Sequence, residues 1–153
     1  MNGWAVFYTV LSGTVVFVFG QIILQFVIVP VQEFLKTIAA IAHARVEHAV
    51  VTANPGVPSA ERIDETSRHL MRLSAQLHSH LFLVRPYVWV SCVFKLPLRS
   101  EVLKASRSLM GLSKSLASVD ANGKTYQWNA ERWESICEAL GIYIEQDDRW
   151  PKE

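Results

Sequence analysis

The chain carries five histidines, and their spacing decides whether they can share a metal ion. They are His43, His48, His69, His78 and His80. Three residues separate His43 from Glu47, where an inverted zinc motif has two, and the five-residue step from His43 to His48 turns the rings apart on a helix. His78 and His80 lie about 200° apart on a helix, so they cannot hold one ion. The spacing predicts solvated or helix-capping histidines and no metal ligand.

Two short segments come close to catalytic motifs but lack what each motif needs. Residues 118–125 end like a phosphate-binding loop, yet Ser118 stands where its first glycine belongs and a helical pattern, not a strand, precedes it. Residues 111–115 lack the second glycine of a nucleophile elbow. We expect a turn in the first segment and helix in the second. No carboxylate pair stands out for acid–base work, so the sequence predicts no catalytic residue, no cofactor and no enzyme.

The two cysteines, Cys92 and Cys137, both fall in apolar surroundings. Cys92 lies in an apolar run, and Cys137 lies on the apolar stripe of a helical segment. Two cysteines alone define no metal site. We expect both to be reduced thiols in the core of a cytoplasmic domain.

One segment of the chain is basic. Residues 85–114 carry six basic residues against one acidic residue, whereas residues 131–153 carry seven acidic residues against three basic ones. The two segments can pack together or face solvent. The basic segment can instead bind anionic lipid, each charge contributing about 1 kcal/mol, or a phosphate-bearing small molecule. The candidate contacts are Arg85, Lys95, Arg99, Lys104 and Arg107.

The elements that hold these residues follow an N-terminal stretch without charge. The chain has 153 residues, 50% hydrophobic and 19% charged, and no charged residue precedes Glu33. A soluble domain has charged residues every few positions, so this stretch indicates a membrane segment. The net charge of +1 argues against a nucleic-acid partner, and the composition excludes collagen-like, disulfide-framework and wholly disordered classes.

The predicted membrane span covers residues 5–29, of which 16 are Val, Ile, Leu or Phe. These side chains favour insertion by about 5 to 10 kcal/mol, and a helix of this length exceeds a hydrocarbon core of about 30 Å, which predicts a modest tilt. A cleaved signal peptide fits less well, since no positive residue precedes the run and the run is too long.

Flanking charge predicts the orientation of the span. Residues 1–4 carry no Lys or Arg, whereas Lys36 and Arg45 follow the span. The positive-inside tendency then predicts an outside N-terminus and a cytoplasmic C-terminal domain. Trp4 and Tyr8 are expected at the outer interface as aromatic anchors.

Small and polar residues divide the span into faces. Thr9, Gly13 and Gly20 share one face, and Gln21 and Gln25 share another. Small residues let a second helix approach, and glutamines can exchange hydrogen bonds across an interface at about 0.6 to 2 kcal/mol each. The pattern predicts self-association or pairing with a partner membrane protein. Glycine and threonine are also common in any spanning helix.

Beyond the span the sequence predicts helices. Pro30 is expected to kink or restart the helix because it lacks a backbone donor. Apolar residues then recur at three- and four-residue steps over residues 31–53, which predicts an amphipathic helix. Ser59 is the predicted N-cap of a helix that runs to about Val84.

The C-terminal half continues the pattern. Residues 86–98 are apolar and too short to span a bilayer, which leaves a core piece, a strand-like run or an interfacial segment open. A helix is expected over residues 100–118. Asn129 is the predicted N-cap of a final helix that Gly141 ends, and residues 146–153 form a loose polar tail.

Residues 98–116, LRSEVLKASRSLMGLSKSL, follow an uncharged span and the Pro30–Glu33 junction. In this the chain resembles small bacterial single-pass membrane proteins of unassigned function. The resemblance covers most of the chain and rests on leucine and serine spacing. It implies a bacterial inner-membrane location and supplies no catalytic residue.

Taken together, the sequence predicts an all-α protein, with a transmembrane helix in residues 1–30 and a small cytoplasmic helical bundle in residues 31–145. We expect a membrane-anchored interaction or assembly module, either a homo-oligomer or a subunit of a membrane complex. The alternative is a ligand-gated membrane effector whose basic segment binds an anionic small molecule.

Overall fold

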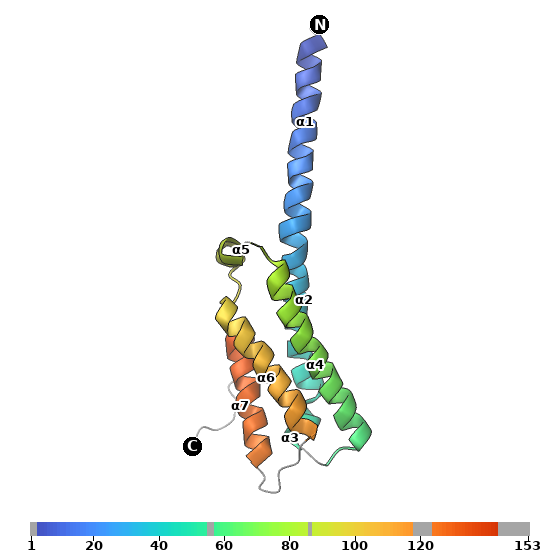
Figure 1. The fold of residues 1–153 in the computed structure, drawn as a ribbon, viewed down its shortest axis with the longest axis vertical. Coiled ribbons are helices and arrows are strands. Elements are labelled where there is room, and N and C mark those ends of the chain that lie inside the picture. Colours follow the sequence, from blue (N-terminus) through green and yellow to red (C-terminus); the bar gives the residue numbers. More distant parts are fainter. Residues whose placement is uncertain (1–2, 55–56, 86, 118–123, 144–153) are drawn as a thin grey trace.

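The computed structural model describes residues 3–54, 57–85, 87–117 and 124–143, and every regular element among them is helical. Three of these elements run on as one long column (Figure 1), and the others pack around or beside its lower part. The column consists of α1 (Gly3–Ile23), η1 (Leu24–Ile28) and α2 (Val29–Glu47). The others are α3 (Ala49–Ala53), α4 (Ala60–Leu83), α5 (Tyr87–Phe94), α6 (Arg99–Ala117) and α7 (Lys124–Leu140). The predicted all-α class is confirmed.

The upper part of the column stands clear of the other helices. Within the described part of the chain, the helix from Val6 to Glu47 is the one long and apolar enough to cross a membrane. Only 11% of its most apolar window is buried, which separates it from the core helix of a soluble protein. A signal sequence near an N-terminus would pass the same test of length and apolarity.

The disturbance expected at Pro30 takes the form of a π-helical turn. Proline donates no N–H, and its ring crowds the carbonyl one turn earlier. The five residues of η1 precede it, and the N–H of Val29 bonds the carbonyl of Leu24 rather than that of Gln25. This wider turn carries the chain from α1 into α2. The predicted boundary at residue 30 therefore lies inside one continuous column.

The helix predicted over residues 31–53 divides at His48. That residue has φ −102° and ψ 14°, so α2 ends before it and the short α3 follows. After the next turn, the Ser59 hydroxyl accepts a hydrogen bond from the Arg62 N–H, which confirms the predicted N-cap of α4.

The bundle is built around the antiparallel pair of α4 and α6, with α7 against α6 and α2 against α4. Serines seven residues apart on each helix join the pair. Ser67 donates to the Ser113 carbonyl at 2.8 Å, and Ser74 donates to the Ser106 carbonyl at 2.8 Å. Small side chains at these positions let the two backbones approach. The leucine stripes then close the core, with Leu70, Leu77, Leu109 and Leu112 fully buried.

The final helix starts earlier than predicted. α7 begins at Lys124, so Asn129 lies inside it and the prediction of an Asn129 N-cap is wrong. The side chain is instead buried, where it accepts from the Ser115 hydroxyl at 2.6 Å and donates to the Thr52 carbonyl at 3.3 Å. The Asn129 side chain thus forms tertiary hydrogen bonds in place of the backbone hydrogen bond that an N-cap would form. Gly141, with φ 67°, ends the helix as predicted.

The open question over residues 86–98 is answered by α5, a short helix whose one buried residue is Val90. It is not a strand, and most of its side chains are exposed, although Val90 and the following Leu96 join the core of the bundle. The predicted polar tail at residues 146–153 and the predicted turn before Lys124 lie outside the described residues.

Candidate functional site

The residues predicted to pack against another helix are all exposed on the column. They are Thr9, Gly13, Gly20, Gln21 and Gln25. A Cβ added at Gly13 or Gly20 would meet no atom within 4 Å. Within the described part of the chain, neither glutamine side chain forms a hydrogen bond. No helix of this chain covers the two predicted faces among the residues described.

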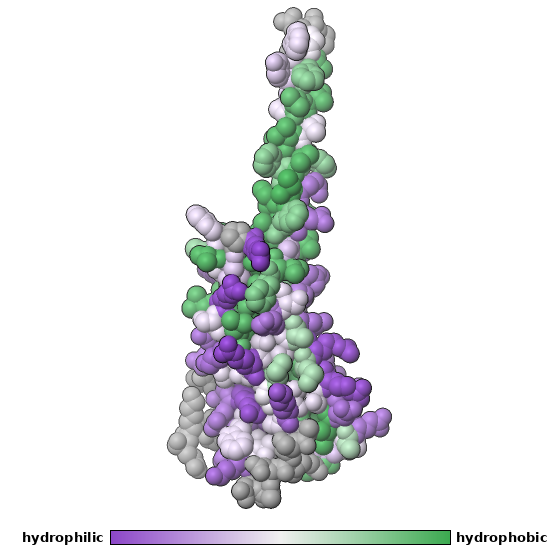
Figure 2. Space-filling view, viewed as in Figure 1, coloured by the Kyte–Doolittle hydropathy of each residue, from purple (hydrophilic) through white to green (hydrophobic). Residues whose placement is uncertain are grey.

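Apolar side chains gather on the same column. Val10, Val16 and Phe26 are 63%, 72% and 66% exposed. Figure 2 shows this apolar surface along the column and polar side chains over the bundle below. An exposed apolar surface this extensive marks a contact with lipid or protein.

A second apolar surface lies on α5. Val88, Trp89 and Val93 are 78%, 76% and 74% exposed. Figure 1 shows α5 beside the upper end of α2, at the level where the free part of the column ends. The two apolar surfaces therefore meet at one level of the molecule.

Tyr87 attaches α5 to the column. Its ring packs edge-on against Phe34 of α2, with the centroids 6.4 Å apart, and its hydroxyl donates to the Pro97 carbonyl at 2.5 Å. Burial raises the pKa of the Tyr87 phenol. At the other end of α5, Lys95 has φ 51°, and the Leu96 N–H bonds the Ser91 carbonyl at 3.0 Å. This left-handed turn sends the chain back toward α6.

The five basic residues predicted to bind an anion are exposed, and they follow α5 and α6 rather than converging. Arg85 and Lys95 flank α5, and Arg99 begins α6 with its guanidinium 5.1 Å from the ring centre of Phe82. Lys104 and Arg107 lie further along α6. Three pockets are described on the surface, and none of these three is lined by any of the five residues.

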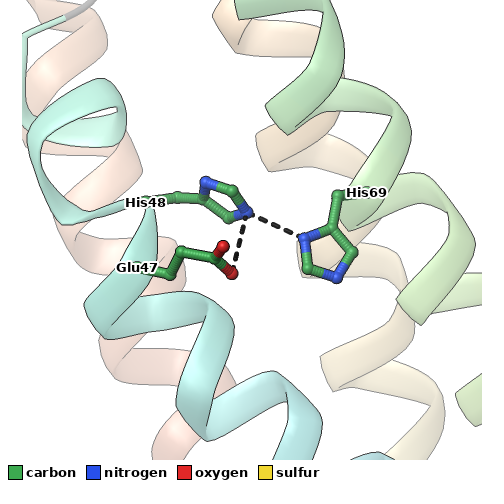
Figure 3. A group of neighbouring side chains, drawn as sticks. All are labelled: Glu47, His48 and His69. Carbon is green, nitrogen blue, oxygen red and sulfur yellow. Dashed lines mark hydrogen bonds and ion pairs between the residues drawn. The ribbon is translucent and has the colours of Figure 1, made fainter. Parts of the chain in front are cut away.

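A group that sequence reasoning did not assemble lies where α2 meets α3. Figure 3 shows Glu47 and His48 facing His69 of α4. One ligand atom from each residue lies within 4.8 Å of the other two. His48 Nε2 is 2.8 Å from His69 Nδ1 and 3.6 Å from Glu47 Oε2. The rings of the two histidines stand edge to face at 5.1 Å.

Further polar groups surround this cluster. Thr66 Oγ1 lies 3.3 Å from His48 Nδ1, and His43 Nδ1 lies 3.6 Å from Glu47 Oε2. Desolvation lowers the pKa of His48, against the opposing effect of the Glu47 carboxylate. His48 is therefore neutral near pH 7, with one ring nitrogen free of a proton.

The sequence hid this cluster because its members come from two helices. His48 and His69 stand 21 residues apart, and only the reversal of the chain between α3 and α4 brings them together. The sequence pattern indicated only the part of the cluster on α4. There, Glu61, Glu65 and His69 recur at four-residue steps and so share one face of the helix.

The two cysteines differ in environment. Cys137 is buried, as predicted, and burial raises the pKa of its thiol. Cys92 is exposed on α5, so its predicted place in a core is wrong. An apolar neighbourhood in sequence predicted burial, but Val90 is the one buried residue of α5 and Cys92 lies among its exposed residues.

A further pocket of about 180 Å³ lies between α3 and α7, lined by residues that include Thr52, Asn129 and Trp133. Trp133 Nε1 is buried and has no hydrogen-bond partner among the residues described. Pockets that hold drug-sized ligands measure about 300–1,000 Å³, so we assign no ligand to this smaller space.

Comparison of the chain with protein-family models, with curated proteins and with solved structures finds no match.

Proposed function

We propose that this chain is a membrane-anchored helical interaction module, in which the upper column spans the bilayer and α5 lies in the headgroup region. The observation that carries the proposal is the meeting of two exposed apolar surfaces at one level, one on the column and one on α5. A membrane edge at that level would cover both surfaces at once. A signal sequence would account for the column but not for α5.

The dimensions of the column support a single span. Residues 5–29 are 25 residues, which as a helix reach about 38 Å at 1.5 Å per residue. This exceeds a hydrocarbon core of about 30 Å by enough to require a tilt.

Charge supports an inner-membrane orientation with the bundle in the cytoplasm. Lys36 follows the span, and its ammonium pairs with the Glu33 carboxylate at 2.7 Å, which lowers the pKa of Glu33. Arg85, Lys95 and Arg99 are exposed around α5. Each basic residue near an anionic leaflet contributes about 1 kcal/mol to membrane attachment. The resemblance to small bacterial single-pass proteins points to the same membrane.

Lipid headgroups suit the basic residues better than a small anionic ligand does. A small phosphate-bearing molecule needs charges that converge on it. Here the charges flank α5 and then continue along α6. A leaflet at the level of α5 can meet Arg85, Lys95 and Arg99, whereas a ligand-gated effector would need a site that the described pockets do not supply.

Self-association through the column is the interaction that we propose. Gly13 and Gly20 leave an open face on which a second helix can approach closely. On the other face, Gln21 and Gln25 offer side-chain hydrogen bonds to a further helix of another copy or of a partner membrane protein, because this chain does not use them.

The test measures association of the full-length protein in bilayers by energy transfer between donor- and acceptor-labelled copies. We expect Gly13→Leu with Gly20→Leu to weaken association about tenfold, since the two leucine side chains prevent the close approach of a second helix. Val15→Leu, at an exposed position away from both predicted faces, is the control and should leave association unchanged. A wild-type protein that stays monomeric in bilayers would exclude self-association.

The membrane assignment has its own measurement. The protein is expected to remain in the membrane fraction after an alkaline carbonate wash, and the bundle to be digested by protease only from the cytoplasmic side. Release by carbonate would exclude the span. Digestion from the outside would reverse the orientation and leave the span intact.

A further inference from the structure

We propose that Glu47, His48 and His69 bind a divalent transition-metal ion, for which zinc is the best match, at the junction of α2, α3 and α4. The proposal does not depend on the membrane assignment, because all three residues belong to the bundle. Two imidazoles and one carboxylate form a ligand set that zinc takes in proteins.

The three ligand atoms lie within 4.8 Å of one another, so small side-chain movements would bring them to the spacing of one shared ion. Ligands about 2.0–2.2 Å from a tetrahedral zinc ion stand about 3.3–3.6 Å from one another. His48 Nε2 and Glu47 Oε2 are 3.6 Å apart, close to that spacing. His48 Nε2 and His69 Nδ1 are 2.8 Å apart and share a hydrogen bond. A small rotation of one ring would exchange this hydrogen bond for two bonds to the metal.

A buried threonine orients the central ligand. Thr66 is 2% exposed, and its Oγ1 lies 3.3 Å from His48 Nδ1. With the proton on Nδ1 donated to Thr66, the lone pair of His48 lies on Nε2, the atom that faces Glu47 and His69. Histidine ligands of metals are commonly held in this way by a second hydrogen bond.

The fourth coordination position faces solvent. The three residues line an open pocket of about 440 Å³ together with Glu61, Glu65, Arg68 and Arg72. Arg68 pairs with Asp64, which offsets part of its charge. Glu65 stands one turn before His69 on the same face of α4 and can supply either a direct ligand or a hydrogen bond to a bound water. Three protein ligands with one open position would leave the ion accessible to a further group.

A bound ion would join the break at His48 to α4. A metal would add a direct link between the helices. Binding to the folded state alone also raises thermal stability.

The experiment uses the full-length protein in detergent, made without a histidine tag and stripped of metal by a chelator. Zn²⁺ is titrated by calorimetry, and Co²⁺ is titrated as an absorption probe of coordination geometry. We expect one ion per chain, a tetrahedral Co²⁺ spectrum and a rise in melting temperature with Zn²⁺ but not with Mg²⁺. Absence of one-to-one binding would overturn the proposal.

Three variants distinguish this site from adventitious surface binding. His69→Ala should lower zinc affinity about 100-fold or more, and Thr66→Val should lower it about 10- to 100-fold as an outer-shell change. His78→Ala removes an exposed histidine from the same helix outside the cluster and should bind zinc as the wild type does. Equal affinity in His69→Ala and wild type would overturn the site. Helicity by circular dichroism must match the wild type, and Thr66→Val decides the matter if His69→Ala does not fold.

Discussion

The upper column and the bundle use the same apolar residue types in opposite ways. In α1 and η1, valine, leucine, isoleucine and phenylalanine side chains are largely exposed, whereas in α4, α6 and α7 such side chains are concentrated in the core. Polar side chains of the two regions also differ in burial and in hydrogen bonding. The Asn129 side chain of the bundle is buried, accepts one hydrogen bond and donates another, whereas the Gln25 side chain of the column is exposed and forms no hydrogen bond in the described structure.

This contrast shows that the two regions are built for different surroundings. Water drives the burial of apolar area in the bundle at about 25 cal/mol per Å². The column gains little of this kind from the described chain, and under the proposed function its gain comes from lipid or from another helix. Substitutions at buried positions of the bundle should therefore lower its free energy of unfolding, whereas substitutions on the exposed column should not.

The largest effect is expected from Leu109→Ala. Leu109 is 0% exposed in α6, and emptying such a position costs about 2 to 5 kcal/mol through lost burial and the cavity left behind. The measurement is denaturant unfolding of the full-length protein in detergent, followed by near-ultraviolet circular dichroism. Val16→Ala, at a position 72% exposed on the column, is the matched control and should change bundle stability by less than about 0.5 kcal/mol. Equal losses in both variants would remove the distinction between the regions.

A smaller effect is expected from Asn129→Leu. The substitution leaves the Thr52 carbonyl without the Asn129 donor, at a cost of about 1 to 3 kcal/mol. It also removes one of the two acceptors of the Ser115 hydroxyl, which keeps the Leu112 carbonyl. Gln25→Leu is the counterpart on the column, and since Gln25 has no partner in the described structure, bundle stability should not fall. A neutral Asn129→Leu would mean that the buried network adds nothing to the stability of the bundle. The same denaturation series gives both values.

Helix periodicity predicted the architecture because each helix of the bundle buries one stripe. The leucines of α4 and α6 fall at helical spacing, and local signals at Ser59 and Gly141 mark two helix ends correctly. Asn129 has the chemistry of a cap, but its buried partners Ser115 and Thr52 come from α6 and α3, which no local pattern reveals.

The candidate sites were predicted less well for a related reason. Each exposed face of the column lies on a single helix, so helical periodicity alone predicts that Gly13 and Gly20 share a face. The pairing of His48 with His69 depends on the break at His48 and on the register of α4. The exposure of α5 depends on its tertiary packing, which the apolar run over residues 86–98 does not predict.

The smallest effect is expected from the two thiols, one in each kind of environment. In detergent at pH 8, Cys92 should react with a maleimide reagent at least about tenfold faster than Cys137, because Cys137 is buried and burial raises its pKa. Mass spectrometry of timed samples gives both rates from one protein. Equal rates would mean that the bundle opens often enough for the reagent to reach Cys137 as easily as it reaches the exposed Cys92.

The raised pKa of Cys137 also gives a pH dependence whose sign can be stated. Below the ordinary thiol pKa of about 8.5 the thiol is protonated in both the folded and the unfolded chain, and its contribution to stability is fully present. As pH rises above that value, the unfolded chain ionises first while the buried thiol keeps its proton, so the free energy of unfolding falls. Cys137→Ala should lose this part of the decline at pH values above about 8.5, and Cys92→Ala should keep it. If both variants declined alike, the decline would belong to other groups and Cys137 would not be a buried thiol of the bundle core.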